Sequence, residues 1–175
     1  MKHMSCPRAG NISVSDACLL ESILEWYNED EGNVSKFVSV VKRKNGMSLR
    51  VIDWLVTNFS KVHSVAIESS GVPRDLNREY VRNLTAYNKR NMDPFARRNK
   101  IKIKIFEKEE RFSTVGQLNF FRWYYKNGVD VYLNKHREVV ERHMKENEGK
   151  KHAMKARGGR FSAVNSFSGS FNMTF

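Results

Sequence analysis

Apolar side chains recur every three or four residues through the first third of the chain, which is the spacing of one face of an α-helix. The first series predicts a helix that is capped by Ser15 or Asp16 and ends in an acidic loop from Asn28 to Gly32. A second, shorter helix stops at Asn45-Gly46, and Ser48 caps a third, so the three together predict a helical core. Their inward positions are Ala17, Leu20, Ile23, Leu24 and Tyr27; Val34, Phe37, Val38 and Val41; and Leu49, Ile52, Leu55, Val56 and Phe59, with Trp54 alongside.

Two segments have the composition or the spacing of β-strands. The segment from Val62 to Glu68 is short and rich in β-branched residues, which favours a strand. The segment from Lys100 to Ile105 alternates strictly between lysine and isoleucine. We therefore expect its isoleucines in the core and Lys102 and Lys104 in solvent.

Helical spacing returns after Ser113. Thr114 and Gln117 have the spacing of a capping box, in which each side chain accepts a bond from the other residue's backbone N–H. Asn127-Gly128 predicts a left-handed stop for this helix, and a last helix is expected from about Asp130 to Glu148. The apolar side of the first of these two helices consists of Leu118, Phe121, Tyr124 and Tyr125.

The residues after Glu148 differ in kind, because Gly, Ser, Asn and Lys dominate them, and we expect them to be disordered. The predicted fold class is therefore α+β: a mainly helical single domain with a small β-sheet and a disordered basic C-terminal tail. The expected boundaries are a flexible N-terminus over residues 1–13, a globular domain over 14–148 and the tail over 149–175. A length of 175 residues suits one domain.

The cellular setting follows from what the sequence lacks. Cys6 and Cys18 are too few to staple a fold of this size, and the N-terminus has no apolar run of the secretory type. We therefore expect a reducing compartment and no secretion. No stretch approaches the ~18 apolar residues of a membrane span, so no membrane partner is expected.

The net charge of +12 arises after residue 70. Residues 1–70 contain eight basic and eight acidic side chains, whereas residues 71–104 contain ten basic and three acidic ones. The residues after Asn147 add five basic and one acidic. Such clustering favours a polyanionic partner, and nucleic acid is the commonest polyanion that a basic protein meets.

The segment from Arg74 to Arg90 predicts an amphipathic helix with a basic stripe. At about 100° per residue, its basic side chains fall on one side and its apolar ones on the other. Arginine suits phosphate because its planar fork makes two parallel bonds. The alternative is a solvated face that Asp75 and Glu79 partly neutralise. The basic stripe is Arg74, Arg78, Arg82 and Lys89, and the apolar side is Leu76, Tyr80, Leu84 and Tyr87.

A basic loop from Tyr87 to Lys100 follows, with a turn at Asp93-Pro94. Phe95 either stacks on a base or plugs the core beneath the loop. The tail after Asn147 adds a flexible basic arm, whose phenylalanines can bind a protein partner or dock on the parent domain. The candidate nucleic-acid contacts are Arg74, Arg78, Arg82, Lys89, Arg90, Arg97, Arg98, Lys100, Lys102, Lys104, Lys150, Lys151, Arg157 and Arg160.

Motifs of catalysis are missing from the sequence, so we expect a non-enzymatic protein without a cofactor. There is no phosphate-binding glycine loop, paired-histidine metalloprotease motif or Cys-x-x-Cys pair. The set His3, Cys6 and Cys18 is one ligand short of a metal site, so no metal is expected. His136 and His143 share a helix face and are expected to pack or to contact phosphate. The spacing of the carboxylates Asp53, Glu68 and Asp93 does not favour a nuclease.

Three segments, Val51–Lys61, Tyr87–Arg98 and Thr114–Trp123, resemble a poorly characterised protein family of nucleocytoplasmic large DNA viruses, of the kind found in marseilleviruses and mimiviruses. The resemblance covers roughly Gly46 to Gly128. It implies a viral setting, with the protein in the virion and in the cytoplasm or nucleus of the infected cell. It supplies no catalytic residue.

Charge and resemblance together predict a non-enzymatic viral protein that binds nucleic acid through phosphates with little sequence specificity. DNA is expected over RNA, and the oligomeric state stays open. The alternative is a virion structural or scaffold protein whose basic surface binds an acidic protein partner. A nuclease or other nucleic-acid enzyme with a hidden site is the third interpretation.

Overall fold

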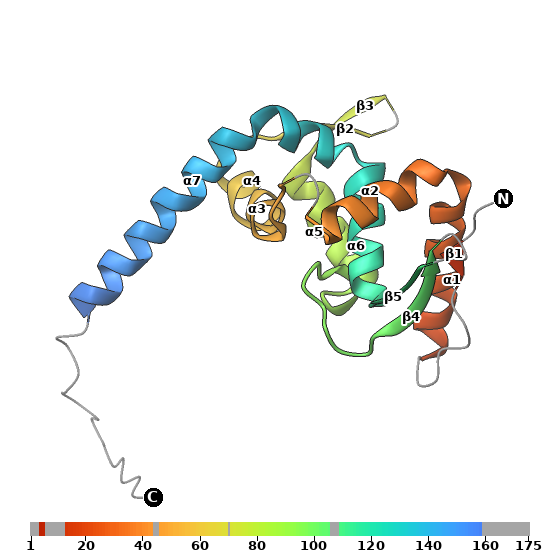
Figure 1. Ribbon diagram of the computed structural model, residues 1–175. Helices are drawn as coiled ribbons and strands as arrows, with labels where there is room; N and C mark the ends of the chain where they lie inside the picture. Colours follow the sequence, from red (N-terminus) through yellow and green to blue (C-terminus); the bar gives the residue numbers. More distant parts are fainter. Residues whose placement is uncertain (1–3, 6–12, 44–45, 70, 106–108, 159–175) are drawn as a thin grey trace, which may run out of the picture.

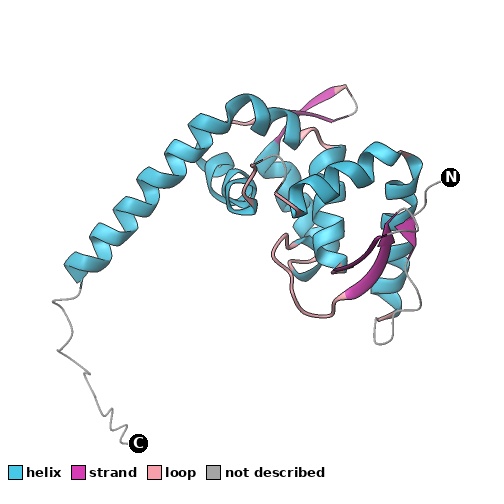
Figure 2. Cartoon of the chain, in the orientation of Figure 1, coloured by secondary structure: helices cyan, strands magenta, loops and turns pink. Residues whose placement is uncertain are grey.

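The computed structural model describes residues 4–5, 13–43, 46–69, 71–105 and 109–158. Helices dominate it, and two small antiparallel sheets complete an α+β domain (Figures 1 and 2). The helical elements are α1 (Val14–Glu29), α2 (Glu31–Val41), α3 (Leu49–Trp54), the π-helical turn η1 (Leu55–Phe59), α4 (Ser60–Val62), α5 (Leu76–Tyr87), the 3-10 turn η2 (Arg90–Met92), α6 (Val115–Lys126) and α7 (Val129–Gly158). The strands are β1 (Met4–Ser5), β2 (Ala66–Ser69), β3 (Val72–Asp75), β4 (Ile101–Ile105) and β5 (Glu109–Ser113).

Helix α6 occupies the centre of the domain, and almost every residue along it is buried. Helix α1 and turn η2 pack against it, while α7 packs against α3 and η1. The Tyr27 hydroxyl donates to the Leu118 carbonyl over 3.1 Å, and the Phe37 and Phe121 rings meet edge to face with centroids 5.8 Å apart. Helix α7 is kinked at His136, where φ is −116° and ψ is 18°, and its C-terminal part projects outward from this body (Figure 1).

The larger sheet has the strand order β1-β4-β5 and pairs Ile101 with Ser113. Ile101 and Ile103 are buried and Lys102 is exposed, which confirms the predicted alternation at these positions. The side chains of Lys104 and Ile105 lie outside the described residues. The smaller sheet is the hairpin β2-β3, which directly precedes α5.

The helical core was predicted correctly, but several of its boundaries were not. Ser13, and not Ser15 or Asp16, caps α1, because its hydroxyl accepts the Asp16 N–H over 3.1 Å. The expected acidic loop is replaced by a single residue, Asp30, whose carboxylate accepts the Gly32 N–H and starts α2. The third helix contains the π-helical turn η1, which periodicity alone does not reveal.

The basic stripe predicted from Arg74 to Arg90 is wrong at both ends. Arg74 lies in strand β3, which the sequence prediction missed, and Asp75 caps α5 by accepting the Arg78 N–H over 2.9 Å. The helix ends at Tyr87, since Asn88 has a φ of 60°, and Lys89 therefore lies beyond it. The predicted strand over 62–68 is β2, displaced toward the C-terminus because residues 60–62 are still helical.

The second half of the chain follows the sequence prediction more closely. Thr114 caps α6 by accepting the Gln117 N–H over 3.1 Å, but the Gln117 side chain bonds elsewhere, so the capping box is half formed. Gly128, with a φ of 63°, supplies the expected left-handed stop. Helix α7 runs to Gly158, so the predicted start of the tail at residue 149 was placed too early. Residues 159–175 lie outside the described part. Among the described residues, no helix is long and apolar enough to span a membrane.

Candidate nucleic-acid interface

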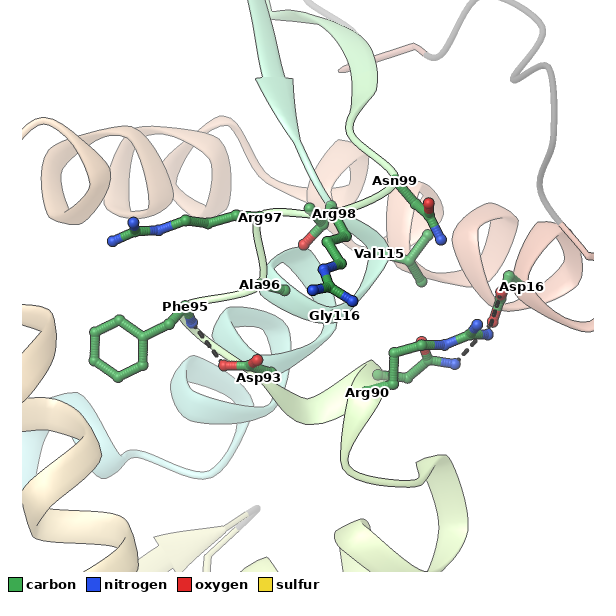
Figure 3. Close-up of a pocket in the computed structure, with 12 residues that line it drawn as sticks. Asp16, Arg90, Asp93, Phe95, Ala96, Arg97, Arg98, Asn99, Val115 and Gly116 are labelled. Atoms are coloured by element: carbon green, nitrogen blue, oxygen red, sulfur yellow. Dashed lines mark hydrogen bonds and ion pairs between the residues drawn. The ribbon is translucent and has the colours of Figure 1, made fainter.

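A cavity of about 680 Å³ opens between the start of α6 and the loop that follows η2 (Figure 3). Three of the predicted contacts line it, namely Arg90, Arg97 and Arg98. In Figure 3, Arg98 extends into the cavity toward Gly116, whereas Arg97 points away from it on the side of Phe95. The cavity lining is Asp16, Arg90, Asn91, Asp93, Phe95, Ala96, Arg97, Arg98, Asn99, Thr114, Val115 and Gly116.

The loop that carries Arg97 and Arg98 is tied to the domain at its start. The Asp93 carboxylate accepts the Phe95 N–H over 2.8 Å, which forms an Asx turn at the predicted Asp93-Pro94 site. The Gln117 amide donates to the Pro94 carbonyl over 3.1 Å and accepts from the Ser113 hydroxyl over 3.0 Å. The bond from Gln117 to Pro94 ties the start of the loop to α6, so the loop arginines are presented from a held segment.

Turn η2 is anchored by a chain of polar contacts that crosses from α1 to α6. The Asp16 carboxylate accepts from Arg90 over 2.6 Å and from the Asn91 amide over 2.8 Å. The Asn91 carbonyl in turn accepts from the Asn119 amide over 2.9 Å, and Asn119 accepts from Arg122 over 2.8 Å. Burial would raise the pKa of Asp16, but bonds from Asn91 and Ser13 and the Arg90 charge outweigh it and lower that pKa. Asp16 therefore stays ionised and holds η2.

The floor of the cavity is the N-terminus of α6. A Cβ built on Gly116 would lie 2.2 Å from the Arg90 carbonyl oxygen, so only glycine lets η2 approach the helix this closely. The first N–H groups of a helix carry partial positive charge, and Thr114 caps only the Gln117 N–H. The helix end therefore adds to the positive potential of the arginines around it.

The loop arginines differ from Arg90 in their pairing. Asp16 neutralises Arg90, whereas Arg97 and Arg98 are exposed and form no ion pair with any residue that the structure describes. Phe95 is 39% exposed, which answers the question that the sequence left open: the ring does not plug the core. Lys100 is also exposed, directly before β4.

The other predicted contacts whose side chains the structure describes do not line the cavity. Arg74 and Arg82 approach the same Glu79 carboxylate, at 3.2 and 4.0 Å, so the alternative of a partly neutralised face holds for them. Lys102 pairs with Glu110 over 2.6 Å. Arg78 and Lys89 are exposed outside the cavity lining, and Lys150 lies on α7. The side chains of Lys104, Lys151 and Arg157 and all of Arg160 lie outside the described residues.

The other residues considered for chemistry have structural surroundings. Asp53 and Asp93 are close enough to interact: burial raises the pKa of Asp53 first, the Asp93 charge raises it further, and the Lys89 charge lowers it. Glu68 lies apart in β2. His143 accepts from the Trp54 indole over 3.0 Å, which fits a packing role. The described residues contain no group of three or more potential metal ligands, and His3 and Cys6 lie outside them.

Sequence reasoning named Asp16 and Gln117 only as capping residues and did not name Asn91 or Gly116, although all four hold the candidate interface together. Asp16 and Asn91 are 75 positions apart, and no local pattern joins them. The nearest signal was the Thr114–Gln117 spacing, which identified a helix start but not its contact with Pro94.

Comparison with known proteins links this chain to a family of unknown function and to a viral relative. Residues 7–170 match the family of unknown function DUF7197, and the chain belongs to this family. It is 30% identical over 137 residues to uncharacterized protein L507 of Acanthamoeba polyphaga mimivirus, an alignment that covers 73% of this chain and 53% of the relative. The chain thus spans about half the length of that relative. No solved structure matches this chain. The predicted resemblance to a poorly characterised giant-virus family is confirmed.

Proposed function

We propose that this protein binds nucleic acid without catalysing a reaction, through phosphate contacts with little sequence specificity, and that it prefers DNA to RNA. One observation carries the proposal: a held loop presents Arg97 and Arg98, unpaired among the described residues, at a cavity floored by a helix N-terminus. Arginine forks and helix N-termini both favour phosphate oxygens.

The contact works by position and charge. A phosphate of the backbone sits against Arg98 at the cavity, and Arg97 meets a neighbouring phosphate outside it. Exposed Phe95, beside Arg97 in Figure 3, offers an aromatic face to an unpaired base, and Lys100 extends the basic surface toward β4. No contact in this arrangement reads a base edge, so specificity is low.

The same proposal includes where the protein acts. The mimivirus relative supports a viral setting. Within that setting, we propose association with the viral genome or the virion, in the particle and in the infected cell. We extend it to related proteins of marseilleviruses. In this setting the basic segment after Asn147 adds non-specific affinity or binds a viral protein partner.

A salt series with duplex and single-stranded oligonucleotides tests the proposal. If four to six phosphates are neutralised, log K against log salt should fall with a slope of about −4 to −5 for duplex. No binding at low salt, or a flat salt response, contradicts it. An acidic polypeptide such as poly-glutamate serves as competitor: displacement of DNA at equal charge concentration would instead favour the scaffold alternative.

A further inference from the structure

A second pocket, of about 320 Å³, lies on the opposite side of the Asn119 contact from the cavity described above and shares no lining residue with it. Helices α1, α5 and α6 and the end of β2 form its wall. The volume is that of a site for a small polar molecule. The lining is Ser22, Ser69, Asn83, Tyr87, Asn119, Arg122, Trp123, Lys126 and Asn127.

The charge of this pocket centres on a buried arginine. Arg122 is 9% exposed, yet its partners are neutral: it donates to the Ser22 hydroxyl over 3.0 Å and to the Asn119 amide oxygen over 2.8 Å. Its guanidinium also lies over the Tyr87 ring, 5.9 Å from the centroid. No carboxylate among the described residues pairs with it. A buried cation without a counterion is stabilised when an anion joins it. Bonds to Ser22, Asn119 and Tyr87 leave two of the five guanidinium donors for that anion.

Two further groups support an anion here. Lys126, which is exposed, adds a second positive charge to the wall, and the wall contains no aspartate or glutamate. The Trp123 indole also belongs to the wall, and its Nε1 is the one buried side-chain donor of the described residues that has no hydrogen-bond partner. A buried donor without a partner is stabilised by nearby negative charge.

We propose that this pocket binds a phosphate monoester, with Arg122 and Lys126 as its cationic contacts. The charge balance selects this class: a monoester carries close to two negative charges near pH 7, which two cations match, whereas a carboxylate or a backbone phosphodiester carries one. The monoester belongs to a free phosphorylated small molecule or to the terminal phosphate of a nucleic-acid strand.

Calorimetric titration of the full chain with inorganic phosphate tests the proposal, with acetate as the singly charged control. Saturable one-to-one binding of phosphate, at least about tenfold tighter than acetate, is expected. The affinity should rise as the pH passes the second phosphate pKa near 6–7, where the dianion forms. No saturation by about 10 mM phosphate, or equal binding of acetate, overturns the proposal.

Variants separate the pocket from general charge effects. Arg122→Gln should lose phosphate binding by more than about tenfold. Because replacing a buried arginine can also unfold the protein, exposed Lys126→Gln provides the second test and should weaken binding about threefold or more. Lys145→Gln, an exposed lysine on α7 outside the pocket, is the matched control. Equal effects of Lys126→Gln and Lys145→Gln contradict the site.

Two additional measurements identify the source of the monoester and keep this inference apart from nucleic-acid binding. A 5′-phosphorylated oligonucleotide that binds more tightly at high salt than its 5′-hydroxyl counterpart assigns the site to strand ends, and equal binding assigns it to a free small phosphate. Charge reversal at Arg97 and Arg98 should leave the phosphate titration unchanged. The proposal for the Arg122 pocket and the proposal for the loop arginines can therefore be refuted separately. A loss of phosphate binding in that variant overturns the assignment to this pocket.

Discussion

Two basic regions of this protein each present two exposed arginines but in different surroundings. The loop arginines, Arg97 and Arg98, are unpaired among the described residues and leave a segment held by Gln117. The helix arginines, Arg78 and Arg82, lie exposed on α5, where Glu79 attracts Arg82 and Arg74 together. Arg78 forms no ion pair with a described residue either, so pairing alone does not separate the two regions. What distinguishes them is that Glu79 offsets Arg82 and Arg74, whereas Arg98 extends into a cavity.

The largest expected loss of affinity comes from reversing the loop arginines. Arg97→Glu with Arg98→Glu should weaken duplex DNA binding about 100-fold at low salt and reduce the salt slope by about 2, because two phosphate contacts become repulsive. Both side chains are exposed, so the melting temperature should hardly change. Fluorescence anisotropy across a salt series measures this, and a change below about threefold would refute the role of the loop.

A smaller loss of DNA affinity is expected when the loop keeps its arginines but the neighbouring turn η2 shifts. In Gly116→Ala the new methyl group would lie 2.2 Å from the Arg90 carbonyl, so η2 must shift. We expect about tenfold weaker DNA binding and a stability loss of about 1–3 kcal/mol. Gly149→Ala on α7, with open space around it, is the control. Unchanged affinity in a folded Gly116→Ala protein would show that charge alone suffices.

The helix arginines should matter less. Arg78→Glu with Arg82→Glu carries the same change of four charge units as the loop variant, but Glu79 already offsets Arg82. We expect at most about fivefold weaker binding in the same assay, from long-range repulsion that salt screens. A loss equal to that of the loop variant would erase the distinction between the two regions.

Among the basic residues, Lys102 on strand β4 should contribute least to DNA affinity. Lys102→Ala is expected to change affinity about twofold or less, because Glu110 already pairs with Lys102. Ile103→Ala, one position along, should instead cost about 2–4 kcal/mol of stability, since Ile103 is fully buried. Chemical denaturation of both variants checks this, and equal stability losses would contradict a half-buried strand.

Asp53→Asn should have the smallest effect on binding and a measurable effect on stability. Burial and the Asp93 charge raise the pKa of Asp53 in the folded state, so its ionised form destabilises the fold. The asparagine variant should therefore melt higher at pH 7. The difference should vanish below the unfolded pKa of about 3.9, where Asp53 is protonated in both states. A variant that melts lower at pH 7 would mean that the charge stabilises the fold.

The sequence predicted those features that depend on local spacing. The alternation of Ile101 and Ile103 located a strand, and Thr114 located the start of the central helix. Prediction from the sequence failed where contacts between distant residues determine the structure. Arg74 has helical spacing with the arginines after it, yet pairing with Ile67 across a hairpin makes it a strand residue. The cavity likewise depends on contacts such as Arg90 with Asp16, which are 74 positions apart.

The 2.2 Å approach at Gly116 also constrains how the family can diverge. A relative that keeps the Arg90 turn against the central helix can replace this glycine only if the turn moves away at the same time. The two positions should therefore change together among relatives, while the arginines of the loop remain free to change on their own. Covariation between residue 116 and the η2 segment would record the cavity in the evolutionary history of the family.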